Sequence, residues 1–231
     1  MNRTNAEKLA AREAQRRRLI LAMMGAGLTA STVLRQATAQ NLVPETQGVL
    51  RLDGDVRING AGATLGAPVQ PGDVITTGIN AYIMFVVGRD AYLVRESSRL
   101  VLEGRSLFVS SLRLITGKLL GVYGRSTVRR QLNTRTATIG IRGTGAYLEA
   151  DPGRTYFCLC YGVADLEPND RPDLRQVYST THHDAPRFVY GDGRVEMMEN
   201  APMENHADSE LLLLESLVGR RPPQAFLDQF M

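Results

Sequence analysis

Between positions 48 and 162, the apolar and polar residues follow the pattern of a β protein. Short apolar or alternating segments are separated by Gly, Asn, Asp and Pro at intervals of roughly 8–12 residues, which is typical of sandwiches and barrels. No helical period persists here, so the sequence predicts an all-β roll or sandwich of short strands. The predicted strands cover residues 49–52, 56–59, 73–77, 81–87, 91–95, 99–103, 107–115, 118–123, 137–141, 146–150 and 155–161.

One predicted strand is apolar on both of its alternating faces. The segment AYIMFVV at 81–87 therefore predicts a central strand that is covered on both sides. A second segment, GIRGTG at 140–145, is rich in glycine but lacks the glycine order and the following helix of a dinucleotide site. We interpret its glycines as allowing tight turns or close strand approach, and not as binding phosphate.

Residues 166–231 predict a small C-terminal extension made of a hairpin and a helix. The hairpin is expected over 187–198, and the helix over 208–221 with Asp208 or Ser209 as its cap. We expect the apolar stripe of this helix to dock on the β domain, although a partner-binding helix would have the same pattern. The stripe comprises Leu211, Leu214, Leu217 and Val218.

Residues 1–39 have the three-part layout of a secretory signal peptide. A basic segment ends at Arg18, an apolar segment follows to Leu34, and Ala37 and Ala39 form an A-x-A cleavage site. The segment QRRRLIL resembles a twin-arginine export signal, so we expect a periplasmic protein that is cut after Ala39. An uncleaved leader would instead anchor the chain in the inner membrane, its only expected link to a membrane.

Removal of the leader changes the charge of the chain. The whole sequence has 27 basic and 24 acidic residues, of which residues 1–39 hold seven and two. The remaining 192 residues carry 20 basic and 22 acidic side chains, a net charge of −2. The basic character belongs to the leader, so no nucleic-acid partner is expected.

Three motifs in the β region occur in the order found in a known family: GDVITTG at 72–78, GKL at 117–119 and RGT at 142–144. With the strand spacing around them, they make residues 48–165 resemble the FecR-type periplasmic domain family of bacteria. The resemblance implies an all-β domain outside the cytoplasmic membrane, and a cell-envelope protein as its partner. The best-known members pass an iron–siderophore signal from an outer-membrane receptor to a cytoplasmic sigma factor.

The chain departs from those signal-passing members on both sides of this region. About 18 residues precede the apolar leader segment, too few to fold alone as a regulatory domain. The segment after Glu167 differs from the receptor-contacting module of the family. The resemblance thus supports the fold of a predicted domain over 40–165, and gives little support to sigma-factor regulation.

The only two cysteines, Cys158 and Cys160, lie in the predicted strand TYFCLCY. Side chains alternate across a strand, so both thiols are expected on one face. They can be small buried apolar side chains, a disulfide, or a pair of metal ligands. Residues two apart in a strand have Cα atoms about 6.5–7 Å apart, which strains a disulfide but leaves room for an ion between the sulfurs.

The only three histidines, His182, His183 and His206, all follow the cysteines in the chain. Thiolate and imidazole groups bind soft and borderline metals, so these five residues form a candidate site for zinc, copper or iron. Their spacing matches no standard zinc pattern, and a loop at 182–183 would have to turn one or both histidines toward the thiols. The alternative is that the histidines make capping or loop hydrogen bonds.

Two functions from different classes follow from these observations. The first is a non-enzymatic, periplasmic, FecR-like binding or sensory module. The second is a metal-binding or metal-dependent redox protein that uses Cys158 and Cys160 with the histidines of the extension. A Cys–His–Asp hydrolase is disfavoured, because a nucleophile inside an apolar strand is poorly exposed and has a raised pKa.

Overall fold

The structure, a computed structural model, describes residues 46–191, 194 and 196–230. The described part of the chain consists mainly of β-strands that join in one continuous sheet, so the predicted all-β fold is confirmed. The predicted leader, residues 1–39, lies outside the described residues.

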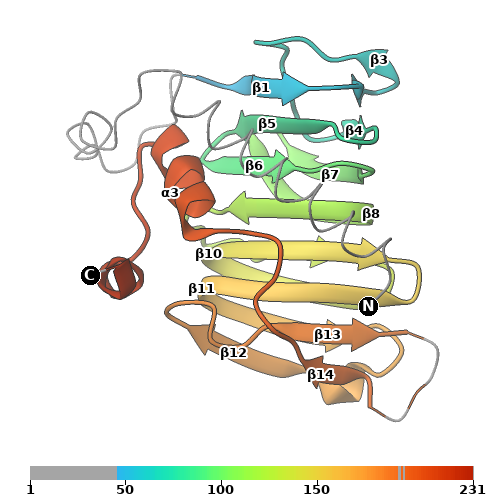
Figure 1. Ribbon diagram of the computed structural model, residues 1–231, viewed down its shortest axis with the longest axis vertical. Helices are drawn as coiled ribbons and strands as arrows, with labels where there is room; N and C mark the ends of the chain where they lie inside the picture. The colour runs from blue at the N-terminus through green and yellow to red at the C-terminus, as the bar shows by residue number, and fades with distance from the viewer. Residues whose placement is uncertain (1–45, 192–193, 195, 231) are drawn as a thin grey trace, which may run out of the picture. The chain divides into compact units, whose positions relative to one another are not determined.

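The strands and helices are labelled as in Figure 1. The strands are β1 (Gly48–Asp53), β2 (Val56–Ile58), β3 (Ala61–Gly62), β4 (Val74–Thr77), β5 (Tyr82–Val87), β6 (Asp90–Val94), β7 (Arg99–Arg105), β8 (Phe108–Val122), β9 (Arg130–Asn133), β10 (Ala137–Asp151), β11 (Arg154–Pro168), β12 (Gln176–Thr180), β13 (Arg187–Tyr190) and β14 (Met198–Asn200). The helical segments are η1 (Pro172–Leu174), α3 (Asp208–Leu217), α4 (Gln224–Leu227) and η2 (Asp228–Phe230).

Three long strands, β8, β10 and β11, pass through two layers of the sheet. The end of β8 pairs with β6 and β10, whereas its start pairs with β7 and β9. Similarly, β11 pairs with β13 over residues 154–157 and with β12 over residues 162–166. We call the layer β1-β5-β6-β8-β10-β11-β13-β14 the first layer. The second layer is β3-β2-β4-β7-β8-β9-β10-β11-β12.

The strand β8 bends between the two layers at Gly117. Its φ of +91° is left-handed, and a Cβ atom there would lie 2.1 Å from the Ser98 hydroxyl, so only glycine fits. The Ser98 hydroxyl also accepts a hydrogen bond from the Lys118 N–H at 2.9 Å. The glycine that predicted a break between two strands is therefore a bend inside one.

The strand β10 is also longer than predicted, because the RGT motif at 142–144 is a bulge and not a turn. Gly143 has a φ of +60°, and the pairing of β10 with β11 shifts register between Arg142 and Gly145. The bulge connects the part of β10 that pairs with β9 to the part that pairs with β8.

An apolar core lies between the two layers. Phe85, Tyr92 and Phe157 of the first layer and Leu100 and Ile139 of the second are among its fully buried members. Met84 and Val86 of β5 and Ala91 and Leu93 of β6 point away from this core, yet these residues are buried too. In β5 the burial of both alternating sets confirms the predicted central strand.

The C-terminal segment covers the outer face of the first layer. Helix α3 lies against β6 and β8 (Figure 1), with Leu211 and Leu214 fully buried. The Arg95 guanidinium donates to both carboxylate oxygens of Glu210 at 2.7 and 2.9 Å, and this buried pair ties α3 to the sheet. The docking expected of the apolar stripe is therefore confirmed.

Two local predictions for the extension have different outcomes. The strands β13 and β14 pair as an antiparallel hairpin, as predicted, but the second strand begins at Met198, where the predicted hairpin ends. Asp192 and Gly193 lie outside the described residues. The predicted helix cap is wrong, because the cap position is Ala207, whose N–H donates to Glu210 Oε2 at 2.9 Å. The carboxylate of Asp208 is instead engaged by two histidines.

Candidate metal centre

Cys158 and Cys160 lie on the outer face of β11. Their neighbours Phe157 and Leu159 belong to the core between the layers, so strand alternation turns both thiols toward the C-terminal cover. Both cysteines are free and fully buried. Beside them, the His183 N–H donates to the Cys160 carbonyl oxygen at 3.1 Å, which holds the segment after β12 against the two thiols.

The turn after β12 aims the imidazole of His183 at these thiols. His183 has a φ of +50°, a left-handed conformation that costs a non-glycine residue on the order of 1–3 kcal/mol. The Asp184 carboxylate stabilises the turn by accepting hydrogen bonds from the Thr180 hydroxyl at 2.5 Å and the Thr181 N–H at 3.1 Å. As a result, His183 Nδ1 lies 3.2 Å from Cys158 Sγ.

His206 reaches the same point from the segment that precedes α3. Its ring stacks on Tyr147, with centroids 4.4 Å apart and an interplanar angle of 19°. Tyr147 lies directly opposite Cys158 in the β10–β11 pairing. Asn205, at a φ of +60°, donates from its side chain to Glu149 Oε1 at 2.6 Å and fixes the turn before the histidine. These contacts place His206 Nε2 3.1 Å from His183 Nδ1.

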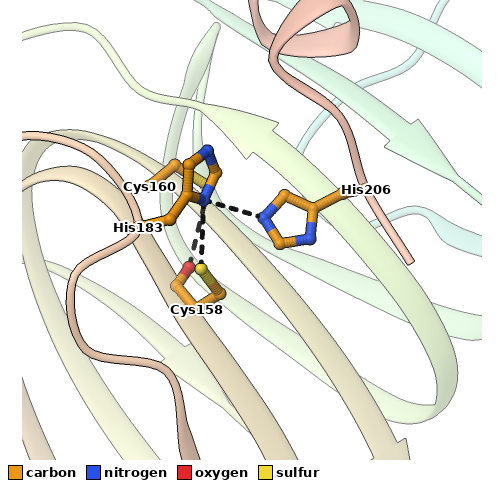
Figure 2. Close-up of side chains that lie close together, drawn as sticks. All are labelled: Cys158, Cys160, His183 and His206. Atoms are coloured by element: carbon orange, nitrogen blue, oxygen red, sulfur yellow. Dashed lines mark hydrogen bonds between the residues drawn. The ribbon is translucent and has the colours of Figure 1, made fainter. Parts of the chain in front are cut away.

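Four side chains converge here, and we call them the inner group: Cys158, Cys160, His183 and His206. Their ligand-type atoms all lie within 4.8 Å of one another. Figure 2 shows one nitrogen of His183 facing both the His206 ring and the Cys158 sulfur. In a tetrahedral zinc site, bond lengths of about 2.0–2.3 Å separate the ligand atoms by roughly 3.3–3.8 Å. The observed N–N and N–S separations, 3.1 and 3.2 Å, are close to these values.

Hydrogen bonds on the far side of each ring determine which nitrogens carry protons. His206 Nδ1 lies 2.7 Å from the Glu204 carbonyl oxygen, which can only accept, so Nδ1 is the donor. His183 Nε2 lies 2.8 Å from a carboxylate oxygen of Asp208, another acceptor. In neutral rings, His206 Nε2 and His183 Nδ1 therefore carry lone pairs that point at each other. Such an arrangement needs a cation between them, either a proton or a metal ion.

The charges of the thiols also favour a cation. A hydrogen bond from the Cys160 thiol lowers the pKa of Cys158, in spite of burial, and His183 and His206 lower it further. Burial raises the pKa of Cys160 well above its ordinary value, and the neighbouring charge of Cys158 adds to the effect. Burial acts to lower the pKa of His183, but Cys158 and then Asp208 outweigh it, so the pKa is raised. These shifts favour the thiolate form of Cys158 and the protonated form of His183 beside it.

Asp208 holds two imidazoles behind the inner group. Its Oδ1 accepts from His183 Nε2 at 2.8 Å, and its Oδ2 lies 3.0 Å from His182 Nε2. Carboxylates and carbonyls that bind the second nitrogen of a histidine are the usual outer partners of metal ligands, because they orient the ring. Asp208 and the Glu204 carbonyl occupy these two positions.

The structure therefore brings together four of the five candidate residues. His182, the fifth, points to Asp208 and away from the thiols, because adjacent side chains of the turn diverge. Asp208 was missed as a site residue, since its position at the start of a predicted helix indicated a cap. Whether the inner group binds a metal stays a prediction.

The inner group is closed off from solvent. Cys158 and Cys160 are fully buried, and His183 and His206 are 7% and 2% exposed. Phe226 of α4 packs near His182 and His183, with ring centroids 4.9 and 5.9 Å away. Four buried ligands without an open position are typical of structural metal sites, whereas catalytic sites keep a position for water or substrate.

The sequence matches no known protein family and no curated protein. Two crystal structures from Parabacteroides distasonis, each of a candidate anti-sigma factor, are similar to this chain at 10% and 9% sequence identity, with TM-scores of 0.47 and 0.46. The matches cover 62% and 55% of this chain, and 64% and 59% of the other chains, less than two thirds of their length. So distant a likeness assigns no function. Within the described residues, no helix has the length and apolar character needed to cross a bilayer.

Proposed function

We propose that this chain is a non-enzymatic, FecR-like module that binds one transition-metal ion through the inner group. The convergence of two imidazole nitrogens, 3.1 Å apart, beside two buried thiols carries the proposal. Small buried cysteines and hydrogen-bonding histidines would explain each side chain alone. They do not explain why the ligand-type atoms of four side chains, from β11 and two later segments, meet within 4.8 Å of one another.

Zinc is the ion that this set of atoms fits best. Two thiolates and two imidazoles are the ligands of closed tetrahedral zinc sites, and both rings here have an outer hydrogen-bond partner. Copper and iron bind the same atom types and are the alternatives. Because all four residues are buried, the ion would stabilise or signal, and would not take up a substrate.

Metal analysis of the purified, zinc-loaded protein tests the proposal. We expect about one zinc per chain in the wild type, and loss of the zinc in the Cys158→Ser variant, because serine is a poor zinc ligand. Cobalt(II) in place of zinc should give the intense thiolate-to-cobalt absorption of a tetrahedral site. Leu159→Val is the matched control, since Leu159 lies between the two cysteines but faces the core. This variant should keep its metal.

The opposite result would show that the two cysteines are only small buried apolar side chains. If folded wild-type protein holds no zinc, copper or iron after loading, and both thiols react freely once the chain is denatured, the metal-binding function is excluded. Retention of the ion in Cys158→Ser with loss in Leu159→Val would place the site elsewhere.

The FecR-like part of the proposal is supported by where the family motifs lie in the fold. The glycine of GKL is at the bend between the layers, and RGT is at the bulge of β10, so both motifs form the junctions of a rolled sheet. The partner would be a cell-envelope protein, and the location the periplasm.

Export is tested by fusing residues 1–39 to a reporter enzyme that is active only outside the cytoplasm. We expect reporter activity with the natural leader, and its loss when Arg16 and Arg17 are both replaced by Lys. A reporter that stays in the cytoplasm would contradict the periplasmic location. Mass spectrometry of the exported full chain then distinguishes a cut after Ala39 from an uncleaved anchor that keeps Met1.

A further inference from the structure

A second group of metal-ligating atoms lies between the inner group and the solvent. His182 Nε2, His183 Nε2 and the Asp208 carboxylate lie within 4.8 Å of one another, and we call these three residues the outer group. His183 belongs to both groups, through Nδ1 on the inner side and Nε2 on the outer side.

The two groups differ in access. The side chains of His182 and Asp208 are 26% and 25% exposed, whereas the shared His183 side chain is 3% exposed. An ion that reaches the buried thiols has to exchange its bound waters for protein atoms on the way. The outer group offers a carboxylate and two imidazoles, which are suitable ligands for a divalent ion that still keeps some water.

We propose that the outer group is a loading site, where a divalent transition-metal ion binds before it moves to the inner group. This inference rests on the proposed function, because a loading site needs a site to fill. The ion would enter past Asp208 and His182. His182, which is not part of the inner group, would then act as a ligand during loading.

The two nitrogens of His183 allow the transfer without an extra reactant. When the inner group is empty, a ring proton on Nδ1 donates to His206 Nε2 at 3.1 Å, and an outer ion that binds Nε2 displaces the proton of that nitrogen to solvent. When the ion moves inward and binds Nδ1, the proton resides on Nε2 and is donated to Asp208 at 2.8 Å. The thiol proton released from Cys160 leaves to solvent as its sulfur binds the ion. The ring therefore serves one site at a time.

The Cys158→Ser/Cys160→Ser double variant isolates the loading site. It removes both thiolates and leaves the outer group intact. We expect it to bind cobalt(II) with lower affinity than the wild type and without thiolate absorption. Adding His182→Gln should weaken that binding by about 10–100-fold. A folded double variant that binds no cobalt(II), or binds it equally well after His182→Gln, overturns the inference.

Loading kinetics provide a test that does not depend on the double variant. In stopped-flow mixing of apo-protein with cobalt(II), we expect the thiolate absorption to appear about tenfold more slowly in His182→Gln, with the same final amplitude. His182→Asp should restore much of the rate, because it again supplies a ligand, whereas a packing role against Phe226 would not be restored. Equal rates in wild type and His182→Gln overturn the inference. Absence of the absorption in the wild type would instead overturn the proposed function.

Discussion

The two faces of the first layer carry similar apolar side chains but are covered by very different structures. On the inner face, Phe85 and Val87 of β5 pack against a second layer of sheet. On the outer face, Ala91 and Leu93 of β6 are equally buried, yet the cover of this strand is the C-terminal segment with its ten-residue helix α3.

The difference shows how a sheet face can be closed with few apolar residues. The C-terminal segment is held to the outer face by buried polar contacts as well as by its leucines. These contacts are the Arg95–Glu210 ion pair and a hydrogen bond of 2.5 Å from the Tyr161 hydroxyl to Glu215. The inner group is the third such contact. A cover held by a few polar contacts can open as a unit while the core between the layers stays closed. Four predictions test this comparison, from the largest expected effect to the smallest.

Phe85→Ala tests the inner face. Phe85 is fully buried, and its truncation leaves a cavity that should cost about 3–5 kcal/mol of unfolding free energy. Because the two layers share β8, β10 and β11, we expect the whole described domain to be destabilised. Urea unfolding followed by circular dichroism measures the loss. An effect confined to the C-terminal segment would contradict the shared-core interpretation.

Glu210→Ala tests the ion pair of the outer face. The variant leaves the buried Arg95 guanidinium without its carboxylate, which should cost about 3 kcal/mol. We expect faster amide exchange in α3, with smaller changes in β7 of the second layer. Glu199→Ala, at a 42% exposed carboxylate, is the control and should have little effect. Equal effects of the two variants would show that the ion pair does not hold α3.

Removal of the proposed metal tests the inner group as a tether. An ion at a concentration 100 times its Kd stabilises the state that binds it by about 2.7 kcal/mol, or about 100-fold in the opening equilibrium. We therefore expect a chelator to speed amide exchange around residues 182–206 and in α3, and to leave β7 protected. Uniform exchange across both regions would indicate that the ion supports the whole fold.

Asp165 tests a surface contact at the far end of β11. A hydrogen bond from Arg175, and then the charge of Arg129, lower the pKa of Asp165, although burial opposes them. A lowered pKa in the folded state stabilises above the unfolded pKa, and this stability is lost as the pH falls through the folded value. Both arginines are about half exposed, so Asp165→Asn should cost less than about 1 kcal/mol at neutral pH.

Urea midpoints of wild type and Asp165→Asn at neutral and acidic pH measure this effect. The difference between the two proteins should shrink on acidification. A difference that grows in acid would contradict the sign of the pKa shift.

Alternation along the chain was sufficient to predict most of the fold. It identified the strands of the core, the double burial of β5, and the shared face of Cys158 and Cys160. It missed the two-residue strand β3, and it failed for β9 and β12, whose sequences RQLN and QVYST contain few apolar residues. It also divided β8 and β10, because a glycine that bends a strand has the same local signal as one that ends it.

The candidate site could be predicted only in part. The residue types were evident, but the choice of His183 over His182 depends on one left-handed residue and on the hydrogen bond to the Cys160 carbonyl. Asp208 follows from neither composition nor spacing, because its two histidine partners come from a turn 25 and 26 residues earlier. Such contacts are set by tertiary packing.

The residues of the inner group are far apart in the sequence, so the group forms late in folding. Cys158 and His183 are 25 residues apart, and His206 follows 23 residues later. No short fragment contains enough of these atoms to hold an ion tightly. The centre comes into existence only when the last strands have joined the sheet and the segment behind them has folded back, so a bound ion would mark a chain that has finished folding.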